Sequence, residues 1–151
     1  MDLMSVYRQI GNRLNRTYQL NPHDEDLINL AKCRAIDLTH LYFLIVKQTE
    51  NSFLNSSYKD SLTQLVYAAS NGTVTDPLSL SPTLVLHILE DELHDLDQQM
   101  YVKFEEVDLS MREWFAGYRE RRLESLEGHS NLPELRWSDL PNELFGLMPD
   151  S

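Results

Sequence analysis

The chain has 151 residues, a net charge of −11 and 42% hydrophobic residues, which suits one globular domain without disulfides or a structural metal. Its only cysteine, Cys33, excludes an internal disulfide framework and a cysteine-based zinc ribbon, and we expect this thiol to be buried in a helix. The longest apolar run, residues 41–46, is far shorter than the ~20 residues of a membrane helix. Because the N-terminus also lacks a secretory signal, we expect an intracellular protein without a membrane anchor.

The negative charge is concentrated in the middle of the chain. Residues 1–60 carry seven Lys/Arg and seven Asp/Glu, residues 61–109 carry one and nine, and residues 110–151 carry five and eight. Binding to a phosphate backbone requires the opposite sign of charge. We therefore expect no direct contact with nucleic acid.

The first predicted helix covers residues 3–18. Leu3, Tyr7, Ile10 and Leu14 recur at spacings of four, three and four, so they share one helical face. This face is expected to pack against the rest of the protein.

The second predicted helix starts at Asn21-Pro22, with Asn21 as N-cap and Pro22 in the first helical position. Residues 41–46 are apolar on all sides, which is typical of the central helix of a bundle; a short strand is the alternative for this run. The predicted buried stripe of the helix consists of Leu27, Ala31, Arg34, Leu38, Leu41 and Ile45.

Two further helices follow, one over residues 57–70 that stops at Asn71-Gly72 and one that opens at Ser81-Pro82. The second of these carries a coiled-coil-like seam, and a seam too long for its own bundle would pair with a second copy to give a homodimer. Residues 100–104 alternate in a way that also fits a short strand. The seam consists of Leu86, Leu89, Leu93, Leu96, Met100, Lys103 and Val107.

A fifth helix is predicted over residues 108–127, closed by Gly128. Short stripes joined by short loops predict an all-α fold, a bundle of about five amphipathic helices with a short irregular C-terminal tail. We assign residues 1–128 to the bundle domain and residues 129–151 to the tail.

One constellation resembles a metal site. His87, Glu90, Asp91 and His94 lie three, four and seven residues apart, so they share a helix face and could hold a divalent cation. A second Asp-x-x-His pair, Asp37 and His40, strengthens the similarity to di-metal helical bundles. Taking 100° per residue, however, both sets point away from the apolar stripes, whereas bundle metal sites project inward.

We therefore expect no cofactor and keep His87, Asp91 and His94 as weak metal candidates. No Ser/His/Asp or Cys/His signature, glycine-rich phosphate loop or family motif is present. A non-catalytic protein is expected, with a metal-dependent helical hydrolase as one alternative.

The carboxylates Glu90, Asp91, Asp95 and Asp97, here called the acidic face, are the first candidate binding surface. A line of carboxylates can meet the basic surface of another protein, or imitate DNA and inhibit a nucleic-acid-binding protein. The plain alternative is a solvated surface that only aids solubility.

The tail is the second candidate. Trp137, Leu144 and Phe145 are apolar anchors that either dock in a partner's groove or fold back over the bundle. From both surfaces we predict a protein that acts by protein–protein interaction, as an adaptor, regulator or assembly component.

Overall fold

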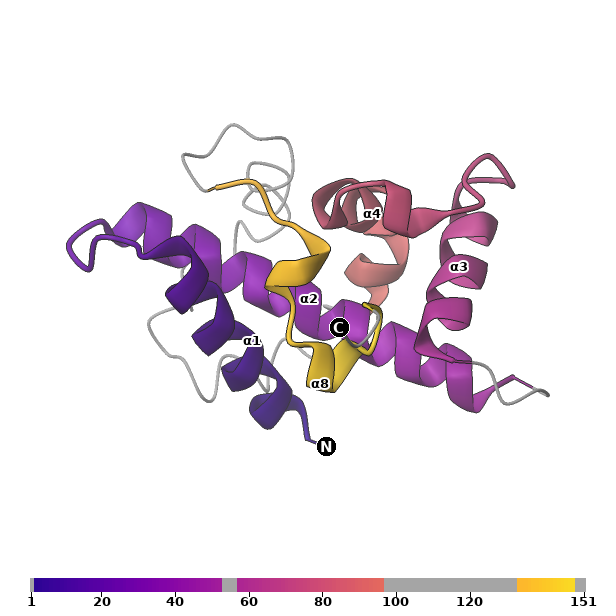
Figure 1. Ribbon diagram of the computed structural model, residues 1–151, viewed down its shortest axis with the longest axis horizontal. Helices are drawn as coiled ribbons and strands as arrows, with labels where there is room; N and C mark the ends of the chain where they lie inside the picture. Colours follow the sequence, from indigo (N-terminus) through magenta and orange to yellow (C-terminus); the bar gives the residue numbers. More distant parts are fainter. Residues whose placement is uncertain (1, 53–56, 97–132, 149–151) are drawn as a thin grey trace.

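The computed structural model describes residues 2–52, 57–96 and 133–148, and every regular element within these ranges is a helix. The predicted all-α fold is confirmed. The long helix α2 runs through the middle of the molecule, with α1 on one side and α3 and α4 toward the other (Figure 1). The elements are α1 (Leu3–Tyr18), α2 (Glu25–Glu50), α3 (Tyr58–Ala69), η1 (Pro77–Ser79), α4 (Pro82–Ile88), η3 (Trp137–Asp139) and α8 (Asn142–Phe145).

Helix α1 has the predicted bounds. The Asp2 carboxylate accepts a hydrogen bond from the Ser5 N–H at 2.8 Å, which caps the first turn. The helix ends where Gln19 adopts a left-handed conformation with φ of 50°. Its most buried residues include Val6 and Ile10, so the contact face is rotated slightly from the predicted stripe.

The predicted start of α2 at Asn21-Pro22 is wrong. The N-cap is Asp24, whose Oδ1 accepts a hydrogen bond from the Leu27 N–H at 3.1 Å, and the helix begins at Glu25. Asn21 instead closes a turn before the helix: its carbonyl accepts from the Asp24 N–H and its Oδ1 accepts from the His23 N–H, both at 3.0 Å. Asn and Asp can both cap a helix. Here the cap is Asp24, which lies three residues closer to the apolar stripe than Asn21.

Helix α2 is the central helix, as predicted, and residues 33–42 are all buried. The predicted outward orientation of Asp37 and His40 is wrong, because these side chains are only 0% and 1% exposed. The helical-wheel argument assumes that one side of a helix faces solvent. That assumption fails for a helix surrounded by other parts of the molecule.

Helices α3 and α4 start at the predicted residues. The Ser57 hydroxyl accepts from the Asp60 N–H, and the Ser81 hydroxyl accepts from the Leu84 N–H ahead of Pro82. The continuous helix predicted after Pro82 is interrupted, because a turn at Leu89 separates α4 from a helical stretch over residues 90–96.

The seam of this region lies within the core of its own chain. Leu86, Leu89 and Leu93 are each 0% exposed, so these positions are not a free surface for a second copy. The later seam positions, from Met100 onward, lie outside the described residues, as does the predicted fifth helix.

Candidate functional site

The acidic face lies on the helical stretch that follows α4. Asp91 and Asp95 are exposed and Glu90 is half-buried, whereas Asp97 lies outside the described residues. Asp91 and Asp95 form no ion pair with any part of the chain that the structure describes. Since they are one helical turn apart, the two carboxylates repel each other by about 0.2–0.5 kcal/mol. Among the described residues, therefore, nothing offsets this repulsion.

The weak metal candidates do not come together with further ligands. His87 is exposed and His94 is half-buried, and the Nδ1 atom of His94 has no hydrogen-bond partner in the described ranges. Among residues 2–52, 57–96 and 133–148, no group of three or more His, Cys, Asp or Glu side chains is placed to hold a metal ion. Within these ranges, the geometry of His87, Asp91 and His94 therefore lends no support to a metal-dependent reaction.

A polar row along α2 was not anticipated from the sequence. Cys33, Asp37 and His40 are spaced four and three residues apart, so they share one helix face, and all three are buried. The buried thiol itself was predicted. The burial of the Asp37 carboxylate and the His40 imidazole was not predicted. The sequence feature that could have indicated it is the apolar character of the other faces of the same helix.

The tail folds back on the bundle, which was one of the two alternatives. Trp137, Leu144 and Phe145 are only 8%, 6% and 1% exposed. The Trp137 indole Nε1–H donates to the Leu80 carbonyl at 2.6 Å, and the Phe145 ring meets the Tyr42 ring edge-on with centroids 5.8 Å apart. The tail segment lies between α1 and α4 (Figure 1). These anchors are therefore occupied within their own chain.

The buried Arg34 binds the start of the described tail segment through hydrogen bonds. The Arg34 guanidinium donates from Nη1 to the Tyr18 hydroxyl at 2.7 Å and to the Pro133 carbonyl at 2.9 Å, and it lies over the Tyr18 ring, 5.7 Å from its centroid. Burial raises the pKa of the Tyr18 hydroxyl, while the nearby Arg34 charge acts in the opposite direction. The sequence placed Arg34 on the buried stripe but indicated no partner for it.

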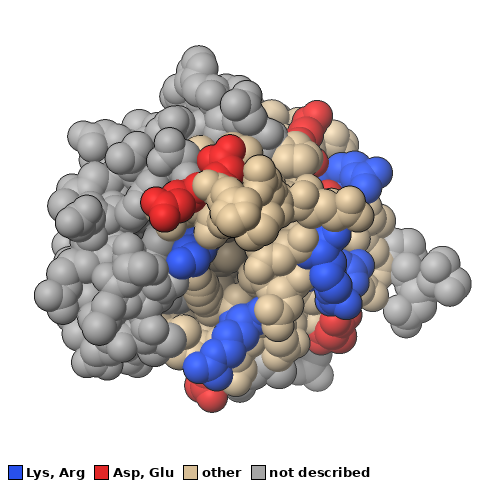
Figure 2. All heavy atoms as spheres, turned by 90° about the vertical axis from the view of Figure 1, so that its left-hand side faces the viewer, with Lys and Arg blue, Asp and Glu red and all other residues tan. Residues whose placement is uncertain are grey.

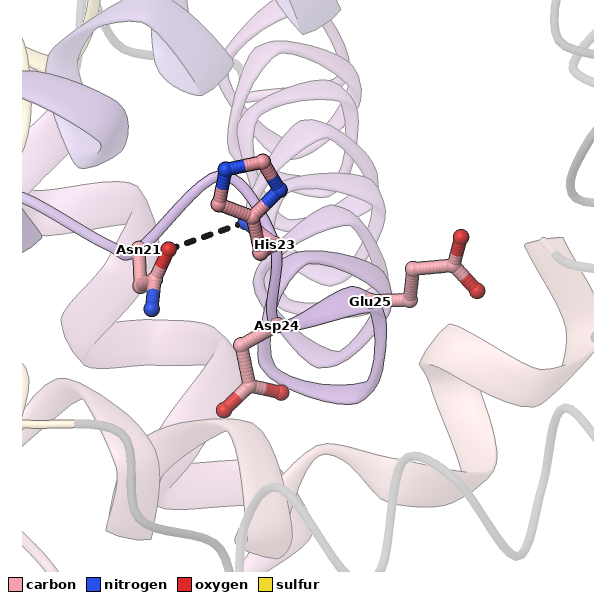
Figure 3. Close-up of a pocket in the computed structure, with 4 residues that line it drawn as sticks. All are labelled: Asn21, His23, Asp24 and Glu25. Carbon is pink, nitrogen blue, oxygen red and sulfur yellow. Dashed lines mark hydrogen bonds between the residues drawn. The ribbon is translucent and has the colours of Figure 1, made fainter.

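Near the start of α2 lies a wide, open hollow of about 470 Å³. Among the described residues it is lined by Asn21, His23, Asp24 and Glu25. Their side chains diverge: the His23 ring and the Glu25 carboxylate point away from each other, and Asp24 points in a third direction (Figure 3). Asn21 and Asp24 are moreover engaged in the turn and the helix cap. The hollow therefore presents no converging set of groups for a ligand.

The end of the molecule where α1 joins α2 has a mixed charge. Basic and acidic side chains both appear there in small separate groups (Figure 2), although the whole chain carries −11. Helix α1 contains Arg8, Arg13 and Arg16 and no acidic residue. Helix α1 is thus a basic element of a strongly acidic protein.

Comparison with known proteins gives no relative. No family model matches the chain, and neither the curated proteins nor the solved structures include a match. Among the helices of the described ranges, none combines the length and the apolar character needed to cross a membrane.

Proposed function

We propose that this protein is a non-catalytic binding protein whose acidic face contacts a basic surface on another protein. The observation that carries the proposal is the state of Asp91 and Asp95: both are exposed, and neither forms an ion pair with the described residues. Exposed charges that are not used in ion pairs can raise the rate of association with an oppositely charged protein. They also favour that protein over partners of like charge. The apolar tail is a weaker candidate, because its anchors are buried.

The test is an affinity capture with the immobilised full chain and the Asp91→Asn/Asp95→Asn variant. We expect the wild-type chain to retain a basic protein from a lysate of its source at about 0.1 M salt, where the Debye length is ~10 Å, and to release it near 1 M, where that length is ~3 Å. The Asp91→Asn/Asp95→Asn variant should not retain it. Glu50→Gln/Asp76→Asn, which neutralises two other exposed carboxylates, is the matched control and should behave like wild type.

Capture of the same proteins by wild type and the Asp91→Asn/Asp95→Asn variant would refute a role for the acidic face. Displacement of the captured protein by duplex DNA would assign the more specific function of a DNA mimic, since the partner's nucleic-acid groove would then be the surface occupied.

A further inference from the structure

Helix α1 carries a basic surface whose charge is opposite to that of Asp91 and Asp95. Arg8 and Arg16 are exposed and form no ion pair with the described residues. They lie eight residues apart with Asn12 and Asn15 exposed between them, and at 100° per residue all four share one side of the helix. We call these four residues the basic face of α1.

The two faces belong to different parts of the molecule. Helix α1 lies at one side of the tail segment, and α4 with the residues that follow it lies at the other (Figure 1). Neither Arg8 nor Arg16 pairs with Asp91 or Asp95 in the same chain. Two arginines and two aspartates of opposite charge, none of them paired with a described residue, therefore lie on separate surfaces of one molecule.

We infer that the basic face of α1 in one copy binds Asp91 and Asp95 of a second copy. This inference rests on the proposed function and identifies the basic surface that it requires as α1 of a second copy. Because the two faces differ, the contact is heterologous, so it joins copies head to tail unless the rotation closes into a ring.

The dimensions of the two faces suit this contact. At 1.5 Å per residue, Arg8 and Arg16 are about 12 Å apart along their helix, and Asp91 and Asp95 are about 6 Å apart along theirs. The two aspartates are therefore closer together along their helix than the two arginines are along theirs, and each guanidinium can take one carboxylate in a bidentate contact. The amides of Asn12 and Asn15 lie between them as further hydrogen-bond donors.

Nucleic acid is a less suitable occupant for the basic face. A duplex presents negative charge along its whole length, so it would also oppose the acidic remainder of a chain whose net charge is −11. A second copy, in contrast, can bring two carboxylates to the basic face without a continuous line of negative charge.

The net negative charge of each copy still repels the other at long range, and we therefore expect association to be strongest near 0.1 M salt. It should weaken at 0.01 M, where the Debye length is ~30 Å, and at 1 M, where it is ~3 Å.

The experiment is sedimentation velocity of the full chain over protein concentration and salt, with charge-swapped variants. Arg8→Glu/Arg16→Glu should lower the apparent association constant at least about tenfold, and so should Asp91→Lys/Asp95→Lys, because each leaves two faces of like charge. A mixture of these two variants, or one chain with all four substitutions, should restore association. Lys47→Glu/Lys59→Glu changes two exposed lysines elsewhere and reaches the same net charge as Arg8→Glu/Arg16→Glu, so it should associate like wild type. Circular dichroism confirms that each variant is folded.

A chain that stays monomeric at every salt concentration would overturn the inference, as would association that the swapped pairs do not restore. Binding of duplex DNA lost in Arg8→Glu/Arg16→Glu would also overturn it and reassign the basic face. If the wild-type chain is monomeric but captures a foreign basic protein through Asp91 and Asp95, the proposed function survives while self-association does not.

Discussion

The tail and the acidic face differ in what their side chains do within the chain. In the tail, Trp137 and Phe145 are buried, one bonded to the Leu80 carbonyl and the other against Tyr42. In the acidic face, Asp91 and Asp95 are exposed and form no ion pair with the described residues. Apolar anchors are stabilised by any apolar surface, including that of their own bundle, whereas a like-charged pair is stabilised only by an opposite charge from elsewhere. We therefore expect substitutions in the tail to change stability, and those at Asp91 and Asp95 to change the proposed binding.

The largest effect on this comparison should come from Phe145→Ala. Removing a ring that is 1% exposed leaves a cavity beside Tyr42, and such substitutions cost about 3–5 kcal/mol in the free energy of unfolding. Urea unfolding followed by circular dichroism measures the loss. Met148→Ala, at a residue that is 38% exposed in the same segment, is the control and should change stability by less than about 0.5 kcal/mol. Equal and small effects of both substitutions would mean that the tail is not part of the core.

A smaller loss, about 1–3 kcal/mol, is expected for Arg34→Met. Methionine retains most of the apolar stem but removes the donor, which leaves the buried Tyr18 hydroxyl and the Pro133 carbonyl without the bonds that Arg34 supplies. The same unfolding measurement applies. Arg13→Met is the control, because the hydrogen bond from Arg13 to the Ser138 carbonyl in the tail is exposed and long, at 3.4 Å, and it should cost less than about 1 kcal/mol. A neutral Arg34→Met would show that the guanidinium does not fasten the tail.

The local parts of the fold could be predicted, because they depend on neighbouring residues. Ser81 caps the helix that follows it, and Leu38, Leu41 and Ile45 lie on the buried stripe. The location of the cap at Asp24 rather than Asn21 could not be decided, because both residue types form the same bond to a helix N–H.

The environment of a residue that depends on distant parts of the chain could not be predicted. Asp37 and His40 were expected to face solvent, but a central helix is covered on every side. The composition around Trp137 and Phe145 fits burial in the bundle and burial in a partner equally well. The choice between them depends on the position of the tail against α1, α2 and the Leu80 region, which is a property of the folded chain. Of the candidate site, the exposure of Asp91 and Asp95 agrees with the predicted outward orientation, and their role in binding stays a prediction. The basic face of α1 was not predicted.

The hydroxyl of Tyr18 gives the bundle–tail contact a pH dependence. Burial raises the pKa of this group above its ordinary value of 10.0, so above about pH 10 the unfolded chain loses the proton more readily than the folded chain. The stability contributed by neutral Tyr18 is therefore complete below pH 10 and is lost as the pH rises further. We expect the stability difference between wild type and Tyr18→Phe to shrink over this range in urea unfolding series. A stability difference for Tyr18→Phe that stays constant over this range would contradict the assignment.

The smallest effect is expected for Asp91→Asn/Asp95→Asn, and its size decides whether the comparison holds. If the acidic face contributes nothing to the fold, neutralising it should leave the free energy of unfolding unchanged or raise it by about 0.2–0.5 kcal/mol, since a like-charge repulsion at i and i+4 is removed. Glu50→Gln/Asp76→Asn provides the reference for losing two surface charges from an acidic chain. A loss of more than about 1 kcal/mol would show that the carboxylates support the fold, and the reduced capture proposed for this variant would then reflect instability. An unchanged stability together with lost capture would separate the two roles, because the same two carboxylates would be dispensable for folding and required for binding.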